Sequence, residues 1–438
     1  MHAAAALANR FAAEASLTAG LVEALNALCR GRWTLMEVCG GQTHTFVRSG
    51  LDQLLPAGLE LIHGPGCPVC VTPVAVLDQA LELARRPEVI LCSYGDMLRV
   101  PGSASAATVD GGEPLGSRPD LLAARAAGAD VRLLTSPLQA LRLAEQHPRR
   151  QVVFLAVGFE TTAPATALLA RQALELGLTN LSVLCAHVRV VPAMEAILAA
   201  PDNRIQGFLA AGHVCAVTGI EELAALVRRW RVPVVVAGFT ASELLLGLRD
   251  LVEQLEAGRA ELANAYPAVV RSQGNPAARR LLAEVFESVT VAWRGLGPIP
   301  AGGLALRGAY AQLEASQRFG LAAAGALVNG ELGSGGPARG GLAIGGLASG
   351  GPARDGPARD GLEGGVGCSP EEGCGGSLPG AGEGADADGV CLAAAVLRGR
   401  LRPPDCPSFG RRCNPEHPLG APMVSSEGAC AAYWQYRR

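Results

Sequence analysis

Three cysteines near the start of the chain lie in glycine-rich turns that follow short apolar segments. Cys39 lies in Met-Glu-Val-Cys-Gly-Gly-Gln-Thr-His, and Cys67 and Cys70 lie in His-Gly-Pro-Gly-Cys-Pro-Val-Cys. Glycine and proline around a thiol are typical of a rigid, exposed turn rather than a packed core. Three thiols presented in this way predict metal-binding or redox chemistry.

Cys67 and Cys70 form a Cys-x-x-Cys element. Two thiols at this spacing can close a disulfide or share a metal ion, and the motif often lowers a thiol pKa. No aromatic residue precedes Cys67 and no thioredoxin-sized domain surrounds it, which argues against a thioredoxin-like enzyme. A redox pair, a shared metal site and one half of a zinc site all remain open.

Cys39 is followed five residues later by His44. If a helix begins near Gln42, the Cys39 sulfur lies at its N-terminus, where the helix dipole favours the thiolate. A thiolate is the form that binds a soft iron centre. His44 is a candidate site residue, and a capping or packing role is the alternative for it.

Four further cysteines in the tail have the spacing Cys-x14-Cys-x6-Cys-x16-Cys: Cys391, Cys406, Cys413 and Cys430. Four thiolates suit a four-iron four-sulfur cluster or a structural zinc ion. Prolines beside Cys406 and after Cys413 disfavour helix and favour ligand-bearing loops. Both metal centres remain open from the spacing, and four unrelated thiols are the third possibility.

Glu160 lies in Gly-Phe-Glu-Thr-Thr-Ala-Pro, a segment that looks like the start of a helix. Its carboxylate could act as an acid, a base or a metal ligand, and the threonine hydroxyls could instead cap the helix by accepting backbone N–H bonds. Weaker candidates in expected turns are Asp96, His187 and His213. Cysteines in apolar segments are expected in the core: Cys29, Cys92, Cys185 and Cys215.

The segment that must position these residues, from about 33 to 255, alternates short apolar runs with amphipathic stretches. The predicted strands are 34–38, 59–63, 89–92, 131–134, 152–157, 181–186, 205–209 and 232–237, and helical patterns include 74–86, 162–176 and 219–230. Repeated strand–helix units predict parallel sheets covered by helices. Ligands bind at the carboxyl ends of such strands, where the Cys39, Cys67 and Glu160 turns fall.

The strands are expected to divide into two sheets, and thus two α/β domains at 20–140 and 141–255. Ser136-Pro137 and the polar run 146–151 interrupt the pattern near that boundary. Residues 330–388 contain an irregular Gly-Pro-Ala-Arg repeat and lack the apolar content for a core, so they are predicted to be a disordered insertion.

Composition narrows the function. The 438 residues are 49% hydrophobic with a formal net charge of −3, which gives no electrostatic footprint for nucleic acid or a membrane surface. The chain contains no lysine, which excludes a lysine Schiff base and a Walker-type phosphate site. With no membrane-length apolar run and no signal-peptide layout, we expect a cytoplasmic protein whose thirteen cysteines are metal ligands or redox thiols.

Several long motifs in the chain are familiar. Besides the segments around Cys39, Cys67 and Glu160, they include Tyr-Gly-Asp-Met-Leu-Arg-Val-Pro from Tyr94 and Met-Val-Ser-Ser-Glu-Gly-Ala-Cys-Ala-Ala-Tyr from Met423. Together they resemble the HypD family, the maturation proteins of nickel–iron hydrogenases. The resemblance covers nearly the whole chain except about 330–388.

This resemblance implies a scaffold that assembles an iron centre carrying cyanide and carbon monoxide, before its transfer to the hydrogenase large subunit. Cys39 would hold the iron together with a cysteine of the small partner HypC, and HypE would supply cyanide. Cys67 and Cys70 would be a redox-active pair. We group His44 and Glu160 with that pair as candidate catalytic residues.

The family fold has two similar α/β domains and a cluster domain, which we assign to 256–329 and 389–438. Cys391, Cys406, Cys413 and Cys430 would hold a four-iron four-sulfur cluster there. The chain departs from the family pattern at Ala393 and Pro422, where the family often has cysteine, and at Thr240-Ala241, which replaces a Glu-Pro pair.

The leading hypothesis is therefore a maturation scaffold with redox-active thiols rather than a conventional turnover enzyme. The main alternative is a general thiol–disulfide oxidoreductase with a structural zinc site. A nucleotide-binding enzyme is disfavoured, because neither a Walker motif nor a dinucleotide glycine fingerprint occurs.

Overall fold

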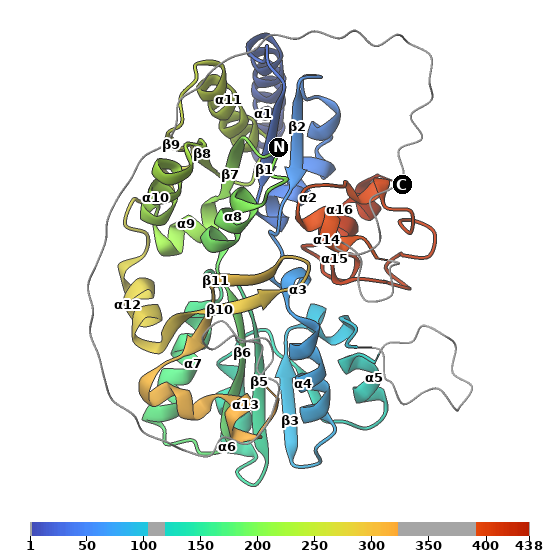
Figure 1. The fold of residues 1–438 in the computed structure, drawn as a ribbon, viewed down its shortest axis with the longest axis vertical. Helices are drawn as coiled ribbons and strands as arrows, with labels where there is room; N and C mark the ends of the chain where they lie inside the picture. Colours follow the sequence, from blue (N-terminus) through green and yellow to red (C-terminus); the bar gives the residue numbers. More distant parts are fainter. Residues whose placement is uncertain (1, 104–118, 323–390, 438) are drawn as a thin grey trace, which may run out of the picture.

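The computed structural model describes residues 2–103, 119–322 and 391–437, and the side chains from residue 14 onward. The insertion predicted to be disordered at 330–388 lies outside the described residues. The described chain forms two sheets stacked end to end along the long axis of the molecule, with the C-terminal segment against their junction (Figure 1).

The first sheet has five parallel strands. Its spatial order is β2 (Leu59–His63), β1 (Trp33–Glu37), β7 (Gly207–Ala211), β8 (Val234–Ala237) and β9 (Leu262–Asn264). The central strands are buried runs of aliphatic residues, which is typical of a parallel sheet covered on both faces.

The second sheet has six strands, and four of them are parallel. Its spatial order is β10 (Phe286–Trp293), β11 (Gly297–Leu306), β6 (Leu181–Val188), β5 (Gln151–Gly158), β3 (Val89–Ser93) and β4 (Val131–Leu133). The hairpin of β10 and β11 is antiparallel and joins the edge of β6, while β3, β4, β5 and β6 pair in parallel. An α/β fold with mainly parallel sheets is therefore confirmed, and all eight predicted strands form.

The helices that cover these sheets and build the tail have the following bounds. They are α1 (His2–Leu28), α2 (Gly40–Arg48), α3 (Pro68–Val71), α4 (Val74–Ala84), α5 (Leu121–Ala126), α6 (Gln139–Gln146), α7 (Ala163–Glu175), α8 (Val190–Ala199), α9 (Gly212–Thr218), α10 (Glu221–Trp230), α11 (Ala241–Glu256), α12 (Pro276–Val285), α13 (Ala315–Arg318), α14 (Ala393–Leu397), α15 (Ala421–Val424) and α16 (Ala429–Tyr436). Short 3-10 turns are η1 (Leu51–Gln53), η2 (Gly95–Arg99), η3 (Gly308–Leu313) and η4 (Pro403–Asp405).

The two sheets interleave along the chain, so the predicted division into 20–140 and 141–255 does not match them. The chain leaves the first sheet after β2, builds β3 to β6 in the second, and returns to the first at β7. Residues 286–306, which we had assigned with the tail, complete the second sheet. Local hydrophobic patterns define strands but not partners, because buried parallel strands all have similar aliphatic sequences.

The carboxyl ends of the two sheets face one another across a shared core. This core contains Cys39 and Cys67 from the turns after β1 and β2, together with Phe159 and Val188 at the ends of β5 and β6. Trp293 of β10 packs in the same core, and its indole N–H donates to the Gly302 carbonyl oxygen. The junction is therefore a packed interior.

The tail, residues 391–437, packs where the sheets meet. Its helix α16 contacts α2, and α15 contacts both α16 and α3. Tail anchors reach both sheets, since the Asp96 carboxylate after β3 accepts the Ser426 backbone N–H at 2.8 Å and Arg437 pairs with Asp52 after α2. The tail thus lies against the candidate thiol turns.

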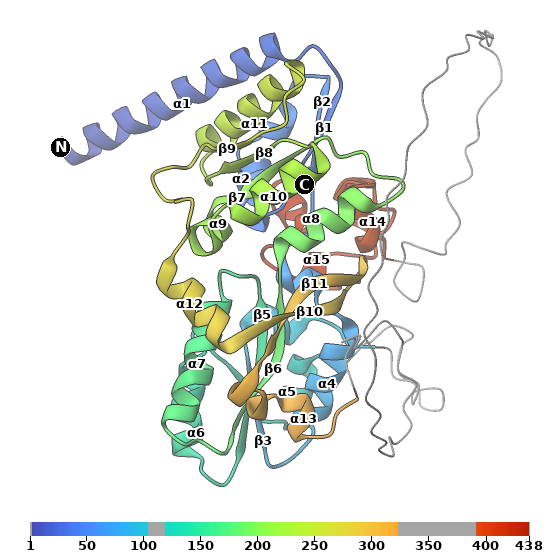
Figure 2. The same cartoon turned by 60° about the vertical axis from the view of Figure 1, so that its left-hand side comes forward.

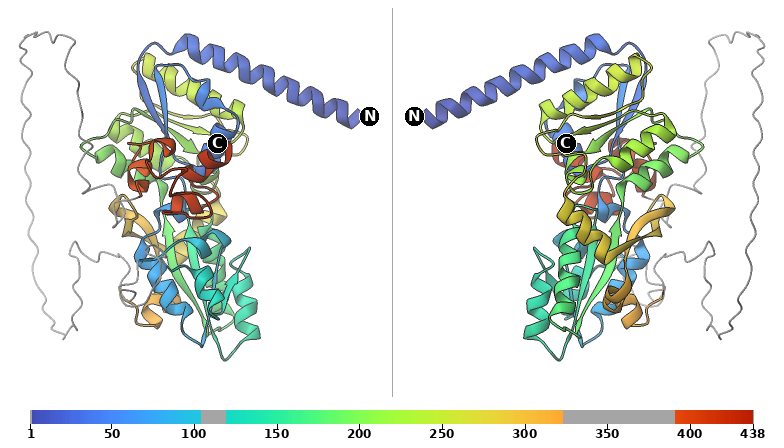
Figure 3. Two further views of the ribbon diagram at one scale, coloured as in Figure 1. Left: turned by 90° about the vertical axis from the view of Figure 1, so that its right-hand side faces the viewer. Right: turned by 90° about the vertical axis from the view of Figure 1, so that its left-hand side faces the viewer.

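Helix α1 packs on α11 through Leu21 and Leu25, near its C-terminal end. Its N-terminal part extends away from the rest of the molecule (Figures 2 and 3). None of the helices in the described part of the chain combines the length and apolar content that a membrane span requires.

Candidate functional site

Cys39 lies between the end of β1 and the start of α2, where it is the N-cap residue. The backbone N–H groups of Gly41 and Gln42 lie near enough to its sulfur to favour the thiolate, although neither makes a hydrogen bond to it. Side chains at two neighbouring glycines would collide with their surroundings, because Gly66 touches the Cys39 backbone and Gly40 touches the Glu427 carbonyl. The local sequence therefore permits three chain segments to meet at this thiol.

Two expectations for Cys39 were wrong. Cys39 is 3% exposed and does not lie in an open turn, because the Gly66 turn, His213 and Phe239 pack around it and Glu427 of the tail meets the adjacent Gly40. The thiolate is also disfavoured: burial and the nearby Glu37 carboxylate raise the pKa of Cys39 to about 12. The helix N–H groups act in the predicted direction but do not outweigh desolvation.

His213, at the start of α9 after β7, is the histidine beside this thiol. Its Nδ1 lies 3.8 Å from the Cys39 sulfur, and its ring stacks at a tilt on Phe239, with 5.1 Å between the centroids. Burial lowers the pKa of His213, so its imidazole is held neutral. Phe239, which the sequence did not single out, closes the other side of the Cys39 turn.

Cys67 and Cys70 are joined by a disulfide bond at the start of α3. Both are buried, with exposed fractions of 3% and 1%. The two thiol turns meet directly, because the Gly40 backbone N–H donates to the Gly66 carbonyl at 3.1 Å. The disulfide also lines a small cavity together with Glu427 and Ala429 of the tail.

A buried carboxylate organises the Cys39 turn. Glu37, the last residue of β1, accepts the Cys39 backbone N–H at 2.7 Å and the Thr43 hydroxyl. Its other neighbour is His63, whose Nδ1 lies 2.7 Å from Glu37 Oε1 and whose Nε2 lies 3.0 Å from the Tyr433 hydroxyl. The sequence motifs contain Glu37 and His63 but do not by themselves distinguish them as site residues. A charged residue ending a buried strand was the available signal for Glu37.

His44 does not join the three thiols through any described contact. It lies on α2, its ring is close to the Ser426 backbone carbonyl, which favours the protonated form, and it meets the Tyr436 ring edge-on at 5.7 Å between centroids. Its buried Nε2 has no hydrogen-bond partner in the described structure, and burial lowers the pKa of His44. The packing role against the tail is the one that the geometry supports.

Glu160 is buried after β5 and serves a different helix from the one expected. Its carboxylate accepts the Val190 backbone N–H at 3.0 Å, at the start of α8. The Thr162 hydroxyl donates to the Phe159 carbonyl at 3.2 Å and caps nothing. Burial raises the pKa of Glu160 to about 7, and Glu160 in turn contributes to raising the pKa of Cys215.

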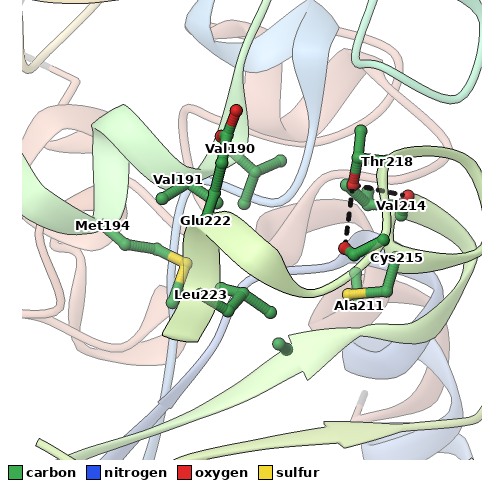
Figure 4. A pocket seen from close by; sticks show the side chains of 11 residues that line it. Val190, Val191, Met194, Ala211, Val214, Cys215, Thr218, Glu222 and Leu223 are labelled. Carbon is green, nitrogen blue, oxygen red and sulfur yellow. Dashed lines mark hydrogen bonds between the residues drawn. The ribbon is translucent and has the colours of Figure 1, made fainter. Parts of the chain in front are cut away.

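A small pocket lies between α8, α9 and α10, and Val190, which binds Glu160 through its backbone N–H, is one of its lining residues (Figure 4). Apolar side chains such as Met194 and Val214 line most of it. Its polar groups are used within the protein: the Thr218 hydroxyl donates to the Val214 carbonyl, and Glu222 pairs with Arg189. The pocket offers packing surface and little chemistry.

Two weaker candidates have structural roles. His187 spans β5 and α7, with 3.2 Å from Nδ1 to the Gly158 carbonyl and 2.9 Å from Nε2 to the Thr166 hydroxyl, and burial lowers its pKa to about 4. Asp96 holds the tail through Ser426 and Ser425. Of the cysteines expected in the core, Cys92 and Cys215 are buried, and Cys29 and Cys185 are half-buried.

The four tail cysteines act on one another electrostatically. Burial raises the pKa of Cys430, and the charges of Cys391, Cys413 and Cys406 raise it further. The Leu419 backbone N–H donates to the Cys413 sulfur at 3.4 Å. In the described part of the chain, however, no three His, Cys, Asp or Glu side chains already stand in a metal-binding arrangement.

Known proteins share this sequence over most of its length. A family model named HypD and described as "Hydrogenase formation hypA family" matches residues 16–331 and 380–437. The hydrogenase maturation factor HypD of Azotobacter vinelandii is 42% identical over 413 residues, which cover 93% of this chain and 90% of that protein. The proteins of the same name from Rhodobacter capsulatus and Escherichia coli are 40% and 38% identical, over 95% and 92% of this chain and 93% and 89% of their own lengths. The chain therefore belongs to the HypD family of hydrogenase maturation factors.

Proposed function

We propose that this protein takes part in nickel–iron hydrogenase maturation as the scaffold on which an iron unit with two cyanides and one carbon monoxide is assembled. The observation that carries the proposal is the meeting of a single thiol, Cys39, with the Cys67–Cys70 disulfide at the facing ends of the two sheets. The cysteine-rich tail packs against the same turns.

Cys39 would hold the iron cargo together with a cysteine of a HypC-type partner. Because the pKa of the free thiol is about 12, the proton stays on sulfur until the incoming metal displaces it. The nearby Gly41 and Gln42 N–H groups, at the positive end of α2, would then stabilise the bound thiolate. A HypE-type protein would deliver cyanide to this iron, and the hydrogenase large subunit would receive the finished unit.

Cys67 and Cys70 would serve as a two-electron store. Reduction of the disulfide takes two electrons and two protons and yields two thiols; oxidation returns both. The burial of both sulfurs argues against a general thiol–disulfide oxidoreductase, since exchange requires an attacking thiolate to reach an exposed sulfur. His44 and Glu160 have no described contact with this pair, so we assign them no step.

The tail cysteines would hold a four-iron four-sulfur cluster, which supplies one-electron redox chemistry when bound. The donor set fits: four thiols within mutual electrostatic reach, and a backbone N–H directed at the Cys413 sulfur. Gly420 leaves the room that Cys391 uses, because any side chain there would meet its sulfur. The four sulfurs would have to draw together around the cluster.

The test is infrared spectroscopy and metal analysis of the protein co-purified without oxygen with its small partner. We expect cyanide and carbonyl bands and about four irons per chain beyond the cargo iron. Cys39→Ala should remove the bands and leave the tail iron in place. Bands of unchanged strength in Cys39→Ala would refute the assignment, and a colourless protein with one zinc would refute the cluster.

A further inference from the structure

A line of buried hydrogen bonds connects the cysteine-rich tail with the Cys39 turn. The Tyr433 hydroxyl lies 3.0 Å from His63 Nε2, His63 Nδ1 lies 2.7 Å from Glu37 Oε1, and Glu37 Oε2 accepts the Cys39 backbone N–H at 2.7 Å. Tyr433, His63 and Glu37 are all buried. The contacts form one continuous path from α16 to the thiol turn.

The chemistry of the groups sets the direction of the bond between His63 and Glu37. The Glu37 carboxylate only accepts hydrogen bonds, so His63 Nδ1 donates to it. His63 Nε2 and the Tyr433 hydroxyl can be partners whichever of them carries the proton, because the hydroxyl both donates and accepts. The tyrosine hydroxyl therefore holds the ring in the orientation that Glu37 requires.

Each residue of the path lies close in sequence to one of the three groups of cysteines. Tyr433 follows Cys430 by one turn of α16, His63 ends β2 just before Cys67, and Glu37 ends β1 two residues before Cys39. Residues one helical turn apart share a face, so Tyr433 and Cys430 move together when the tail helix moves. The path thus joins the three segments that carry the tail thiols, the disulfide and the single thiol.

We propose that Glu37, His63 and Tyr433 are positioning residues that hold the Cys39 turn in register with the tail helix. Docking of the tail fixes Tyr433, which orients His63, which aligns the carboxylate that holds the Cys39 backbone. The effect on bound iron rests on the proposed function. The coupling between the position of the tail helix and that of the Cys39 turn does not.

The tyrosine hydroxyl can be separated from the packing of its ring. The Tyr433 ring meets the His63 ring edge-on, with 5.4 Å between centroids, and Tyr433→Phe keeps that contact while removing one hydrogen bond. The matched control is Tyr436→Phe, one turn further along α16, where the ring lies against His44. Both variants keep the aromatic side chain and the helix.

The first measurement is hydrogen–deuterium exchange on the full chain. Loss of the Tyr433 hydroxyl should speed exchange of the peptide spanning 36–44 about five- to tenfold, because a buried hydrogen-bond path loses one member. Tyr436→Phe should leave that peptide unchanged, and peptides from β5 should be unchanged in both variants. Glu37→Gln, which keeps an acceptor for the Cys39 N–H, should show a smaller change than Glu37→Ala.

The second measurement is the infrared spectrum of the complex with the small partner, where Tyr433→Phe should shift or broaden the cyanide bands at undiminished tail iron content. Unchanged exchange at 36–44, or faster exchange spread evenly over the chain, would overturn the inference. If the wild type carries no cyanide bands while exchange at 36–44 responds as expected, the proposed function fails and the coupling stands.

Discussion

Two buried glutamates sit at comparable places in the two sheets and have different uses. Glu37 ends β1 of the first sheet, and Glu160 follows β5 of the second. Glu37 gathers contacts from three separate segments, namely the Cys39 turn, β2 and, through His63, the tail. Glu160 interacts with the Val190 backbone N–H at the start of α8 and with its own backbone N–H.

The comparison shows that position in an α/β fold does not by itself make a functional site. Both glutamates lie at the strand ends where ligands usually bind. Only the first is linked to the cysteine turns and the tail, because its partners Thr43 and His63 line the same small cavity as the disulfide and the tail. The second binds the backbone of Val190, a residue that lines the apolar pocket between α8, α9 and α10.

The largest expected effect is a difference in unfolding free energy between variants of the two glutamates. Glu37→Ala removes the acceptor for Cys39, Thr43 and His63, and breaking a buried network of this kind costs about 3–5 kcal/mol of unfolding free energy. Glu160→Ala at pH 8 should cost about 1 kcal/mol, because the lost hydrogen bond is offset by removal of a buried charge. Chemical denaturation of both variants measures the difference, and equal losses would contradict the comparison.

The next effect is a pH dependence that belongs to Glu160. Burial raises its folded pKa to about 7 from an ordinary value of 4.5, so the native state binds more protons between these values. The stability from protonated Glu160 is fully present below about pH 4.5 and is lost as the pH rises through 7, by about 3 kcal/mol in total.

Glu160→Gln removes this titration. The unfolding free energy of the variant relative to wild type should therefore increase by about 3 kcal/mol between pH 4.5 and pH 8. Denaturant titrations at several pH values measure it. A difference that does not change with pH would show that Glu160 titrates normally.

A smaller and local effect is expected at the anchor of the tail. Asp96→Ala removes the acceptor for Ser426 and Ser425 and should lower the local opening free energy of the tail by about 2 kcal/mol, with little change in global stability. Limited proteolysis of the tail measures this. The matched control is Asp130→Ala, which breaks surface ion pairs in the second sheet and should leave tail cleavage at the wild-type rate.

The smallest expected losses of unfolding free energy come from removing one threonine hydroxyl near each glutamate, at Thr43 and at Thr162. Thr43→Val removes a hydroxyl that donates to the buried Glu37 carboxylate and should cost about 1.5 kcal/mol. Thr162→Val removes a hydroxyl that bonds within its own exposed turn and should cost about 0.5 kcal/mol. A larger loss at Thr162 than at Thr43 in thermal denaturation would reverse the assignment of the two turns.

The sequence was sufficient to locate the strands of the parallel sheets, because each is a short aliphatic run ending in a turn. It missed the β10–β11 hairpin, since Gly-Pro-Ile-Pro-Ala-Gly-Gly reads as a loop. The prolines are tolerated because β11 pairs with β6 only at Gly303 and Leu304, beyond them.

The candidate site was predictable in its thiols but not in its surroundings. Cysteine spacing and glycine-rich turns were enough to single out Cys39, Cys67 and Cys70. Burial was not predictable, because the cover comes from His213, Phe239 and a tail almost 400 residues further along the chain. Side-chain direction was also hidden: His44, in the Cys39 motif, packs on the tail, while His213 at the start of α9 takes the place beside the sulfur.

If Cys39 receives iron together with a partner protein, as proposed above, the close approach of Glu427 to Gly40 has a consequence for the timing of that step. A thiol that is 3% exposed cannot meet a partner protein's cysteine while the tail rests on its turn. Opening of the tail must then precede each encounter, and the rate of loading should level off at high partner concentration at the opening rate. Stopped-flow mixing with increasing partner would show this plateau, and a rate that stays proportional to partner concentration would show that the thiol is reached without opening.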